Sequence, residues 1–478
     1  MVFSSVTFLF YFLPLILLLY FGFRPVRWKN TVLLVMSLLF YMWGAGEVVL
    51  VFMASIAGNW MFGLLINRAD RKQQPAVKKA WLTLAIVMNL ALLGYYKYAN
   101  FLVEQLDQVI FWILPQVRPF PNPGILLPIG ISFFTFQALS YVIDVYRGHV
   151  GVIKNPVDMG MYLSMFPQLI AGPIVRYDEI EPQVKSRQHT WDNVASGLVR
   201  FMLGLFKKAV IADPIGMIAD QAFGLDQGLG AGLAWLGLVA FTLQVYFDFS
   251  GYSDMAIGLG RVFGFHFREN FNRPYMAVSF TDFWRRWHIS LSTWFRDYVY
   301  IPLGGSRVSS WKIYFNLLVV FVLMGFWHGA NWTFIALGLY HGFFMCWERI
   351  SGKRLPEDFR HPGLQRMIAF FLIMLGMVFF RARNLPAAAD YFRGLVTIPQ
   401  EPLHFYWLAN ISNQSLVTLG FGLLLVFWPR AESSGSYFDH ADSRTAAWLR
   451  LSVAALGLVA AVLMMASSDF QPFIYFKF

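Results

Sequence analysis

"MVFSSVTFLFYFLPLILLLYFGF", residues 1–23, places an apolar run ahead of any Lys or Arg. A removable signal peptide has basic residues before its apolar core and a small-residue cleavage pattern after it, and this stretch has neither. We therefore expect an uncleaved first membrane span. The first basic residues, Arg24, Arg27 and Lys29, follow that span. Because Lys and Arg collect in cytoplasmic loops, they predict a periplasmic N-terminus and a cytoplasmic first loop.

The rest of the chain has the same apolar character. Of its 478 residues, 57% are hydrophobic and 14% are charged, whereas soluble domains carry about 25% charged residues. The net charge of +11 comes from short basic clusters between apolar runs, which is typical of cytoplasmic loops rather than of a nucleic-acid-binding face. We predict a multi-pass membrane protein with no nucleic-acid partner. The single cysteine, Cys346, excludes a multi-cysteine metal site, and we expect no metal and no bound cofactor.

Apolar runs predict an all-α architecture of about ten to twelve transmembrane helices. After the first span they lie at roughly 31–41, 48–66, 80–101, 125–146, 157–175, 195–222, 230–262, 313–327, 330–350, 366–385, 408–428 and 447–466. Gly and Pro interrupt two of them, in "PNPGILLPIG" (121–130) and "FPQLIAGP" (166–173). Broken or re-entrant helices at membrane depth occur where protein or a water-filled cavity receives the freed backbone groups. We therefore expect a central cavity.

The chain offers no soluble appendage long enough to fold alone. Its longest polar stretches are loop-sized and lie at 351–363 and 431–445. We therefore predict one integral membrane domain over residues 1–478, with any functional site inside it.

The segment "SFTDFWRRWHISLSTWFRDYVY", residues 279–300, differs from the spans. Ser279 followed by Asp282 resembles a helix N-terminal capping box. Two faces separate at helical spacing: an apolar stripe of Phe280, Trp284, Trp287, Leu291, Trp294 and Tyr298, and a polar face of Asp282, Arg285, Arg286, Thr293, Arg296 and Asp297. This pattern predicts an interfacial amphipathic helix that lies at the membrane surface or lines a cavity.

The stretch "GFWHGANWTF", residues 325–334, sets His328 beside Trp327 in an apolar run. One interpretation is a core histidine bonded to a neighbouring carbonyl. The other is a functional group, because ionisable side chains at membrane depth are costly and usually functional. Gly325 and Gly329 allow close approach of backbone or ligand, and Asn331 adds a polar side chain. A buried neutral imidazole is suited to be a general base, so we favour the functional interpretation.

Four further ionisable residues lie in or beside apolar sequence. His288, at the edge of the amphipathic stripe, either faces solvent and headgroups or lines a cavity. His341 is expected to be a packing histidine. Asp248 and Asp254 either orient a histidine or form a structural ion-pair network, for which the candidate cations are Arg261, Arg268, Arg285 and Arg286.

Several long motifs resemble the membrane-bound O-acyltransferase family, and within it the alginate O-acetyltransferase group of bacterial polysaccharide acetylases. The motifs are "MVFSS" (1–5), "LLPIGISFFTFQALSYVIDVYRG" (126–148), "FPQLIAGPIVR" (166–176), "GLFKKAVIAD" (204–213), "YFDFSGYSDMAIGLG" (246–260), "ENFNRPY" (269–275), "FWRRWHISLSTWFRDYVYIPLGG" (283–305), "GFWHGANWTF" (325–334) and "PFIYFKF" (472–478). The resemblance implies that His328 is the catalytic histidine and His288 the second required polar residue. It also implies a ring of helices around a thinned centre, with a tunnel from a cytoplasmic acyl donor to an acceptor on the other face.

We therefore expect an O-acetyltransferase of the bacterial inner membrane. Cytoplasmic acetyl-CoA is the expected donor, with Arg285 and Arg286 attracting it, and backbone N–H groups near Gly329 or the Asn331 amide are the expected oxyanion donors. The expected acceptor is an exported polysaccharide (alginate, cellulose or another glycan) or a periplasmic protein that completes the transfer. Membrane lipid surrounds the chain. A proton-coupled transporter or flippase is the alternative, since broken helices, intramembrane carboxylates and a central histidine also suit a carrier. A scaffold for a synthase complex is a third interpretation.

Overall fold

A computed structural model describes residues 2–117, 119–225, 228–352, 361–398, 411–428, 444–467 and 473. Within these ranges all regular secondary structure is helical, as the apolar runs predict. The chain divides into two compact units. Unit 1 comprises 1–190 and 263–267, and unit 2 comprises 191–262 and 268–478.

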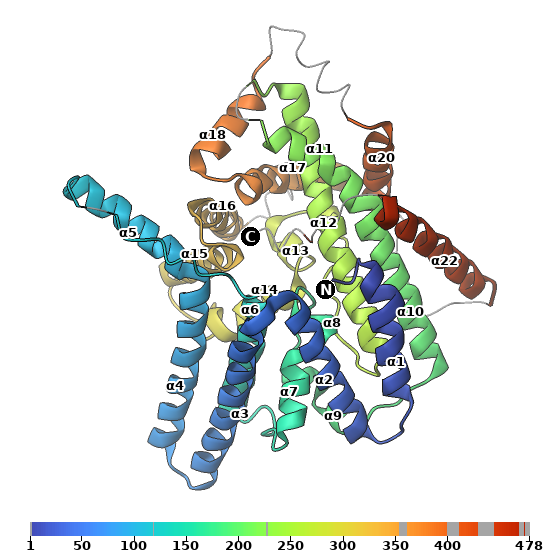
Figure 1. The fold of residues 1–478 in the computed structure, drawn as a ribbon. Coiled ribbons are helices and arrows are strands. Elements are labelled where there is room, and N and C mark those ends of the chain that lie inside the picture. The colour runs from blue at the N-terminus through green and yellow to red at the C-terminus, as the bar shows by residue number, and fades with distance from the viewer. Residues whose placement is uncertain are drawn as a thin grey trace. The chain divides into compact units, whose positions relative to one another are not determined.

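Unit 1 is built from apolar helices and short π-helical or 3₁₀ turns. Helices α3 and α4 lie side by side (Figure 1), and a core of aromatic rings includes Phe8, Phe40 and Phe166. Its elements are η1 (Phe8–Phe12), α1 (Leu13–Phe21), α2 (Val26–Ala45), η2 (Gly46–Val48), α3 (Val49–Arg71), α4 (Pro75–Leu93), η3 (Gly94–Tyr98), α5 (Ala99–Ile113), α6 (Ile131–Arg147), α7 (Pro156–Ser164), α8 (Phe166–Leu169) and α9 (Tyr177–Lys185).

Both predicted helix breaks are present in unit 1. Residues 121–130 are not helical, and α6 begins only after Gly130, which has a left-handed backbone (φ +75°). The second break separates α7 from the single-turn α8. The two broken segments touch, because a Cβ on Gly130 would lie 2.6 Å from the Leu169 carbonyl oxygen. Only glycine allows this contact at that backbone angle.

Unit 2 contains the remaining helices, and α12 lies against both α10 and α11 (Figure 1). Its elements are α10 (Trp191–Phe206), η4 (Lys207–Ala212), α11 (Asp213–Phe223), α12 (Ala231–Val262), η5 (Pro274–Met276), α13 (Phe280–Trp284), α14 (Ile289–Phe295), η6 (Arg296–Tyr300), α15 (Ser310–His328), α16 (Trp332–Ile350), α17 (Pro362–Arg381), α18 (Leu385–Gly394), α20 (Asn413–Phe427) and α22 (Arg444–Ser467). Glycines bring α10 and α12 into backbone contact, because a Cβ on Gly197 would lie 2.5 Å from the Gly258 carbonyl oxygen.

Six helical segments among the described residues are long and apolar enough to cross a membrane. They are Val26–Arg71, Pro75–Ile113, Ala231–Val262, Ser310–His328, Pro362–Arg381 and Ala447–Ser467. The first two are long enough to include more than one of the predicted spans. The chain is a multi-pass membrane protein. The expected ten to twelve spans included runs that fold into shorter helices, such as α6 and α10, or that break at a proline, as α7 and α8 do.

The expected continuous helix over 279–300 is wrong. The segment forms α13, a turn at 285–288, α14 and the π-helical turn η6. The break falls at His288, whose backbone is left-handed (φ 43°, ψ 54°) and so cannot continue a right-handed helix. The predicted cap at Ser279 is confirmed, since its side chain accepts a hydrogen bond from the Asp282 backbone N–H.

Some predicted features lie outside the described residues. They are most of the polar loops at 351–363 and 431–445, the start of the run at 408–428, Met1 of the first motif, and the terminal motif at 472–478 apart from Phe473.

Candidate active site

His328 is the last residue of α15, and a close glycine crossing fixes its place. A Cβ on Gly325 would lie 3.1 Å from the Gly338 Cα, and one on Gly338 would lie 2.4 Å from the Phe321 carbonyl oxygen. Gly329, just beyond His328, lies against the Phe334 ring, where a Cβ would approach to 2.2 Å. The glycines around the histidine therefore allow α15 and α16 to pack at backbone distance.

His328 lines a cavity in unit 2. The walls are mainly apolar and aromatic, and they include Val245, Phe283, Trp284, Trp287, Phe321, Leu337 and Phe380. Two histidines, His328 and His341, are also in the lining. The expected cavity is thus present, and the histidine predicted to be functional lies in its wall.

His288 is fully buried, and Asn270 contacts its ring. Asn270 Oδ1 accepts hydrogen bonds from the Ser290 backbone N–H (3.2 Å) and the Ser290 hydroxyl (2.9 Å), while its amide nitrogen donates to Ser253 Oγ (3.1 Å). These contacts assign the oxygen of the Asn270 amide. His288 Nδ1, 3.2 Å from that oxygen, must then carry the proton. The lone pair of the neutral imidazole is therefore on Nε2.

Aromatic rings enclose His288 and link it to His328. The ring centroid of Trp327 lies 5.9 Å from that of His288 and 5.0 Å from that of His328, and Phe249 stacks edge-on at 4.6 Å from His288. Burial lowers the pKa of His288 well below its usual value, and a charge on His328 would lower it further. His288 is therefore neutral at pH 7. The interpretation of His288 as a headgroup-facing residue is wrong.

Glu348 of α16 holds α13, which supplies part of the cavity wall. Its buried carboxylate accepts hydrogen bonds from the backbone N–H groups of Phe280 (2.6 Å) and Thr281 (3.0 Å) and from the Thr281 hydroxyl (2.6 Å). A carboxylate is favourable at the positive end of a helix. This contact and the Ser279 cap fix the start of α13, and Trp284 at its end reaches the cavity.

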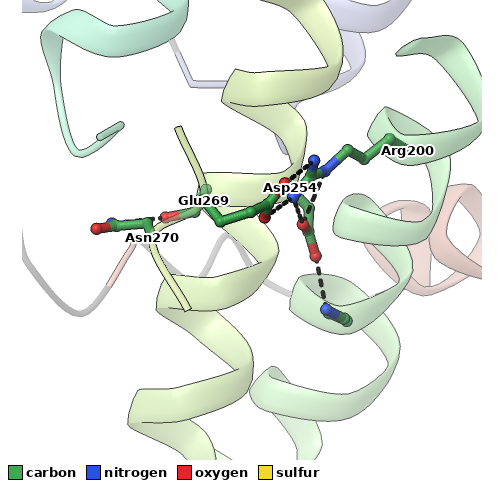
Figure 2. A network of polar contacts seen from close by, with 6 residues as sticks. Arg200, Asp254, Glu269 and Asn270 are labelled. Atoms are coloured by element: carbon green, nitrogen blue, oxygen red, sulfur yellow. Dashed lines mark hydrogen bonds and ion pairs between the residues drawn. The ribbon is translucent and has the colours of Figure 1, made fainter. Parts of the chain in front are cut away.

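Asp254 lies at the centre of a buried ion-pair network (Figure 2). It accepts from Arg200 Nη2 (2.8 Å) and Lys207 Nζ (2.6 Å), and Arg200 also pairs with Glu269. Glu269 directly precedes Asn270 (Figure 2), and Asn270 contacts the His288 ring. The network therefore anchors the segment that orients the second histidine.

Asp248 forms an ion pair with a different lysine, Lys208. Lys208 Nζ lies 2.8 Å from Asp248 Oδ1 and 2.6 Å from Asp213 Oδ1. The structural ion-pair interpretation of both aspartates is confirmed, with Arg200 and Lys207 pairing with Asp254 and Lys208 pairing with Asp248. The cations that the structure pairs with Asp248 and Asp254 come from α10 and η4, where a π-helical turn directs the neighbouring Lys207 and Lys208 to different carboxylates on α12.

The other predicted residues have structural contacts. Asn331 caps α16 by accepting from the Thr333 N–H and donates to the Arg383 carbonyl oxygen (2.8 Å). Arg286 pairs with Asp282 (2.8 Å), and Arg285 is exposed.

Asn270 was not among the predicted site residues, and His341 was expected to be a packing histidine. Asn270 lies in a motif that carries the resemblance, but no periodicity marks it as a partner of His288.

Comparison with known proteins decides the family. The family model described as "MBOAT, membrane-bound O-acyltransferase family" matches residues 147–385, and that range includes both histidines and the cavity lining. The chain belongs to the membrane-bound O-acyltransferase family. Its membership identifies an acyltransferase and removes the grounds for the transporter and scaffold interpretations.

Several relatives are similar to this chain over 81% or more of their own length. A protein of Azotobacter vinelandii named "Probable alginate O-acetylase AlgI" is 43% identical, with 100% of each chain covered. One of Pseudomonas aeruginosa with the same name is 45% identical over 89% of this chain and 81% of its own. The peptidoglycan O-acetyltransferase of Helicobacter pylori is 34% identical over 100% of this chain and 98% of its own. The expectation of an O-acetyltransferase is confirmed.

Proposed function

We propose that this O-acetyltransferase moves an acetyl group onto hydroxyl groups of an exported polysaccharide, with His328 as the general base. The observation that carries the proposal is the position of His328 in the wall of a cavity that has apolar sides and few polar groups. The names of the relatives support a glycan acceptor, alginate first, with cellulose or another glycan as alternatives. Acetyl-CoA on the cytoplasmic side is the proposed source of the acetyl group.

In this mechanism His328 accepts the proton of the attacking hydroxyl while the hydroxyl oxygen forms a bond to the acetyl carbonyl carbon. The C–S bond of the thioester then breaks, and the protonated histidine returns the proton to the leaving thiolate. A backbone N–H near Gly329 is the proposed donor to the tetrahedral oxyanion. Asn270 holds His288 in one tautomer. The His288 ring in turn stabilises the Trp327 ring, which contacts His328. Arg285 remains the proposed surface attraction for an anionic donor, because Arg286 is already paired.

The proposed setting is the bacterial inner membrane with a periplasmic N-terminus and the whole chain acting as one domain. The acceptor hydroxyl belongs either to the polysaccharide or to a periplasmic protein that completes the transfer. Both acceptors need the same proton removal, so the role of His328 does not depend on which is used.

The test measures acetyl esters on the exported polysaccharide in cells with wild type, His328→Ala or no copy of the gene. We expect His328→Ala to lower acetylation by about 10²- to 10⁴-fold, the usual contribution of a general base, at an unchanged protein level in the membrane. His361→Ala is the matched control, because His361 is exposed at the start of α17. Wild-type acetylation by His328→Ala would refute the proposed role, and chemical analysis of the esterified sugar identifies the acceptor.

A further inference from the structure

Helix α5 exposes an apolar stripe that the described part of the chain does not cover. The stripe consists of Leu102, Leu106, Val109 and Ile113, which follow one another at helical spacing and are between 52% and 61% exposed. No side chain of α5 is buried in the described part of the chain. A contiguous apolar surface of this kind indicates an interaction site.

The segment that follows α5 binds its opposite, polar side. Asp107 Oδ1 accepts a hydrogen bond from the Phe120 backbone N–H (2.8 Å). Nearer the start of the helix, the Asn100 amide donates to the Ile125 carbonyl oxygen (2.8 Å) and accepts from the Ile125 N–H (3.1 Å). The segment 119–125 therefore returns along the polar side of α5, and the apolar stripe is left on the other side.

The length of the preceding helix places α5 at a membrane surface. Helix α4 has 19 residues, or about 28 Å at 1.5 Å per residue, which nearly matches a hydrocarbon core of about 30 Å. The π-helical turn η3 follows it with Tyr95, Tyr96 and Tyr98, and tyrosine is enriched at the membrane–water interface. Helix α4 therefore crosses the membrane by itself, and α5 begins where the chain leaves the hydrocarbon core.

The basic residues at the other end of α4 indicate which surface this is. Arg68, Arg71, Lys72, Lys78 and Lys79 surround the turn between α3 and α4. Because such residues collect on the cytoplasmic side, they predict a cytoplasmic turn. The η3 turn and α5 then belong to the periplasmic side.

Two observations favour lipid as the partner of the apolar stripe. First, α5 continues directly from α4 through η3, with a change of direction (Figure 1), and the exposed Leu84, Val87 and Leu90 of α4 already form a lipid-facing surface. Second, Trp112 near the end of α5 is 85% exposed, and tryptophan is typical of the headgroup region.

We propose that α5 lies in the periplasmic surface of the membrane as an interfacial helix. Its apolar stripe contacts the acyl chains of the outer-leaflet phospholipids, and its polar side, with the bound segment 119–125, faces water. Because α5 contains Glu104 and Asp107 but no Lys or Arg, burial of the stripe binds it to the membrane without attraction to anionic headgroups. This inference does not rest on the proposed function.

The test measures the depth of nitroxide labels on the full-length protein in phosphatidylcholine nanodiscs. Cys346→Ser removes the single native cysteine, and Leu106→Cys or Gln108→Cys then provides one labelling site. Gln108 is the matched control, because it is also exposed and lies on the polar side of α5. Accessibility to oxygen and to a water-soluble nickel chelate should place the Leu106 label about 10 Å deeper, the diameter of a helix with its side chains.

A label at Leu84→Cys on α4 provides the lipid-facing reference. The difference in depth between the two α5 labels should be the same when the nanodiscs contain phosphatidylglycerol, since α5 has no basic side chain.

Three results would overturn the proposal. Equal accessibility of both α5 labels to the chelate would show that α5 projects into water, and hydrocarbon depth for both would show a transmembrane continuation of α4. A Leu106 label shielded from oxygen and from the chelate alike would show that a protein, such as a second copy of this chain, covers the stripe.

Discussion

Polar groups are paired with one another in the ion-pair network of α10 and α12. In the histidine cavity of the same unit, two buried polar atoms have no partner among the described residues. In the network, Arg200, Lys207, Asp254 and Glu269 satisfy one another at 2.5 to 2.8 Å. In the cavity, His341 Nδ1 and the Trp284 indole nitrogen lie in an apolar wall without partners among the described residues. The contrast separates charged groups that pair with one another from an imidazole and an indole nitrogen that no described residue pairs.

The two regions are nevertheless connected. The segment that begins with Glu269 leaves the network and continues to Asn270, which fixes the tautomer of His288. The ion pair of Glu269 therefore helps to hold Asn270 in the position that fixes the proton of His288 on Nδ1.

The largest effect on stability is expected at Asp254. Asp254→Ala removes the shared carboxylate, which leaves Lys207 without its ion-pair partner and the buried Arg200 paired with Glu269 alone. Breaking a buried pair in this way costs about 3–5 kcal/mol. Thermal unfolding of the purified protein, together with its level in the membrane, measures the loss.

Asp390→Ala provides the matched control, because Asp390 pairs with Arg393 on the surface, where their side chains are 62% and 78% exposed. Such a pair contributes about 0–1 kcal/mol. Equal stability of the two variants would show that the buried network does not hold the fold.

A smaller effect, on chemistry rather than on the fold, is expected at Asn270. Asn270→Leu leaves the His288 Nδ1–H without its acceptor and should lower kcat by about 5- to 150-fold, since an unsatisfied buried donor costs about 1–3 kcal/mol. Asn270→Asp keeps an acceptor and should recover part of the rate.

The control for Asn270 is Asn316→Leu, which removes another buried amide that donates to the Leu303 carbonyl oxygen. If it slows turnover as much as Asn270→Leu does, the effect belongs to packing and not to the tautomer of His288.

The smallest effect is a pH dependence of stability. Because burial lowers the pKa of His288 in the folded protein, the unfolded chain gains a proton near pH 6.5 that the folded chain does not. The stabilising contribution is complete above pH 6.5 and decreases as the pH falls below it. Between pH 7.5 and 5.5 the free energy of unfolding should fall by about 1.4 kcal/mol through this residue.

His288→Asn removes this titration while keeping a side chain that tolerates the left-handed backbone. Thermal unfolding of wild type and variant at both pH values gives the difference. Parallel pH profiles would mean that His288 is protonated equally in the folded and unfolded states.

The sequence predicted the features that depend on one stretch of chain. Apolar runs indicated the helices, Pro and Gly indicated the breaks at 121–130 and 166–173, and glycines around His328 indicated close packing. The family and the expected enzyme class followed from long motifs. The proposed catalytic roles of His328 and His288 are not tested by the structure and remain predictions.

Features that depend on contacts between helices could not be predicted. The partners of Asp254 lie 47 and 54 residues earlier in the chain, and helix register decides which cation meets which carboxylate. The break at His288 was hidden because the apolar spacing continues on both sides of it. Asn270 has no pattern of its own, since its role comes from the turn that brings Ser290 and His288 to one oxygen.

The charge network also has a consequence for the order of synthesis. Arg200, Lys207 and Lys208 precede α12, which carries Asp248 and Asp254. A carboxylate is costly to transfer into a bilayer alone. Since the chain emerges from the ribosome N-terminus first, the cations are already made when α12 reaches the translocation machinery, and they can neutralise both carboxylates as that helix enters the membrane.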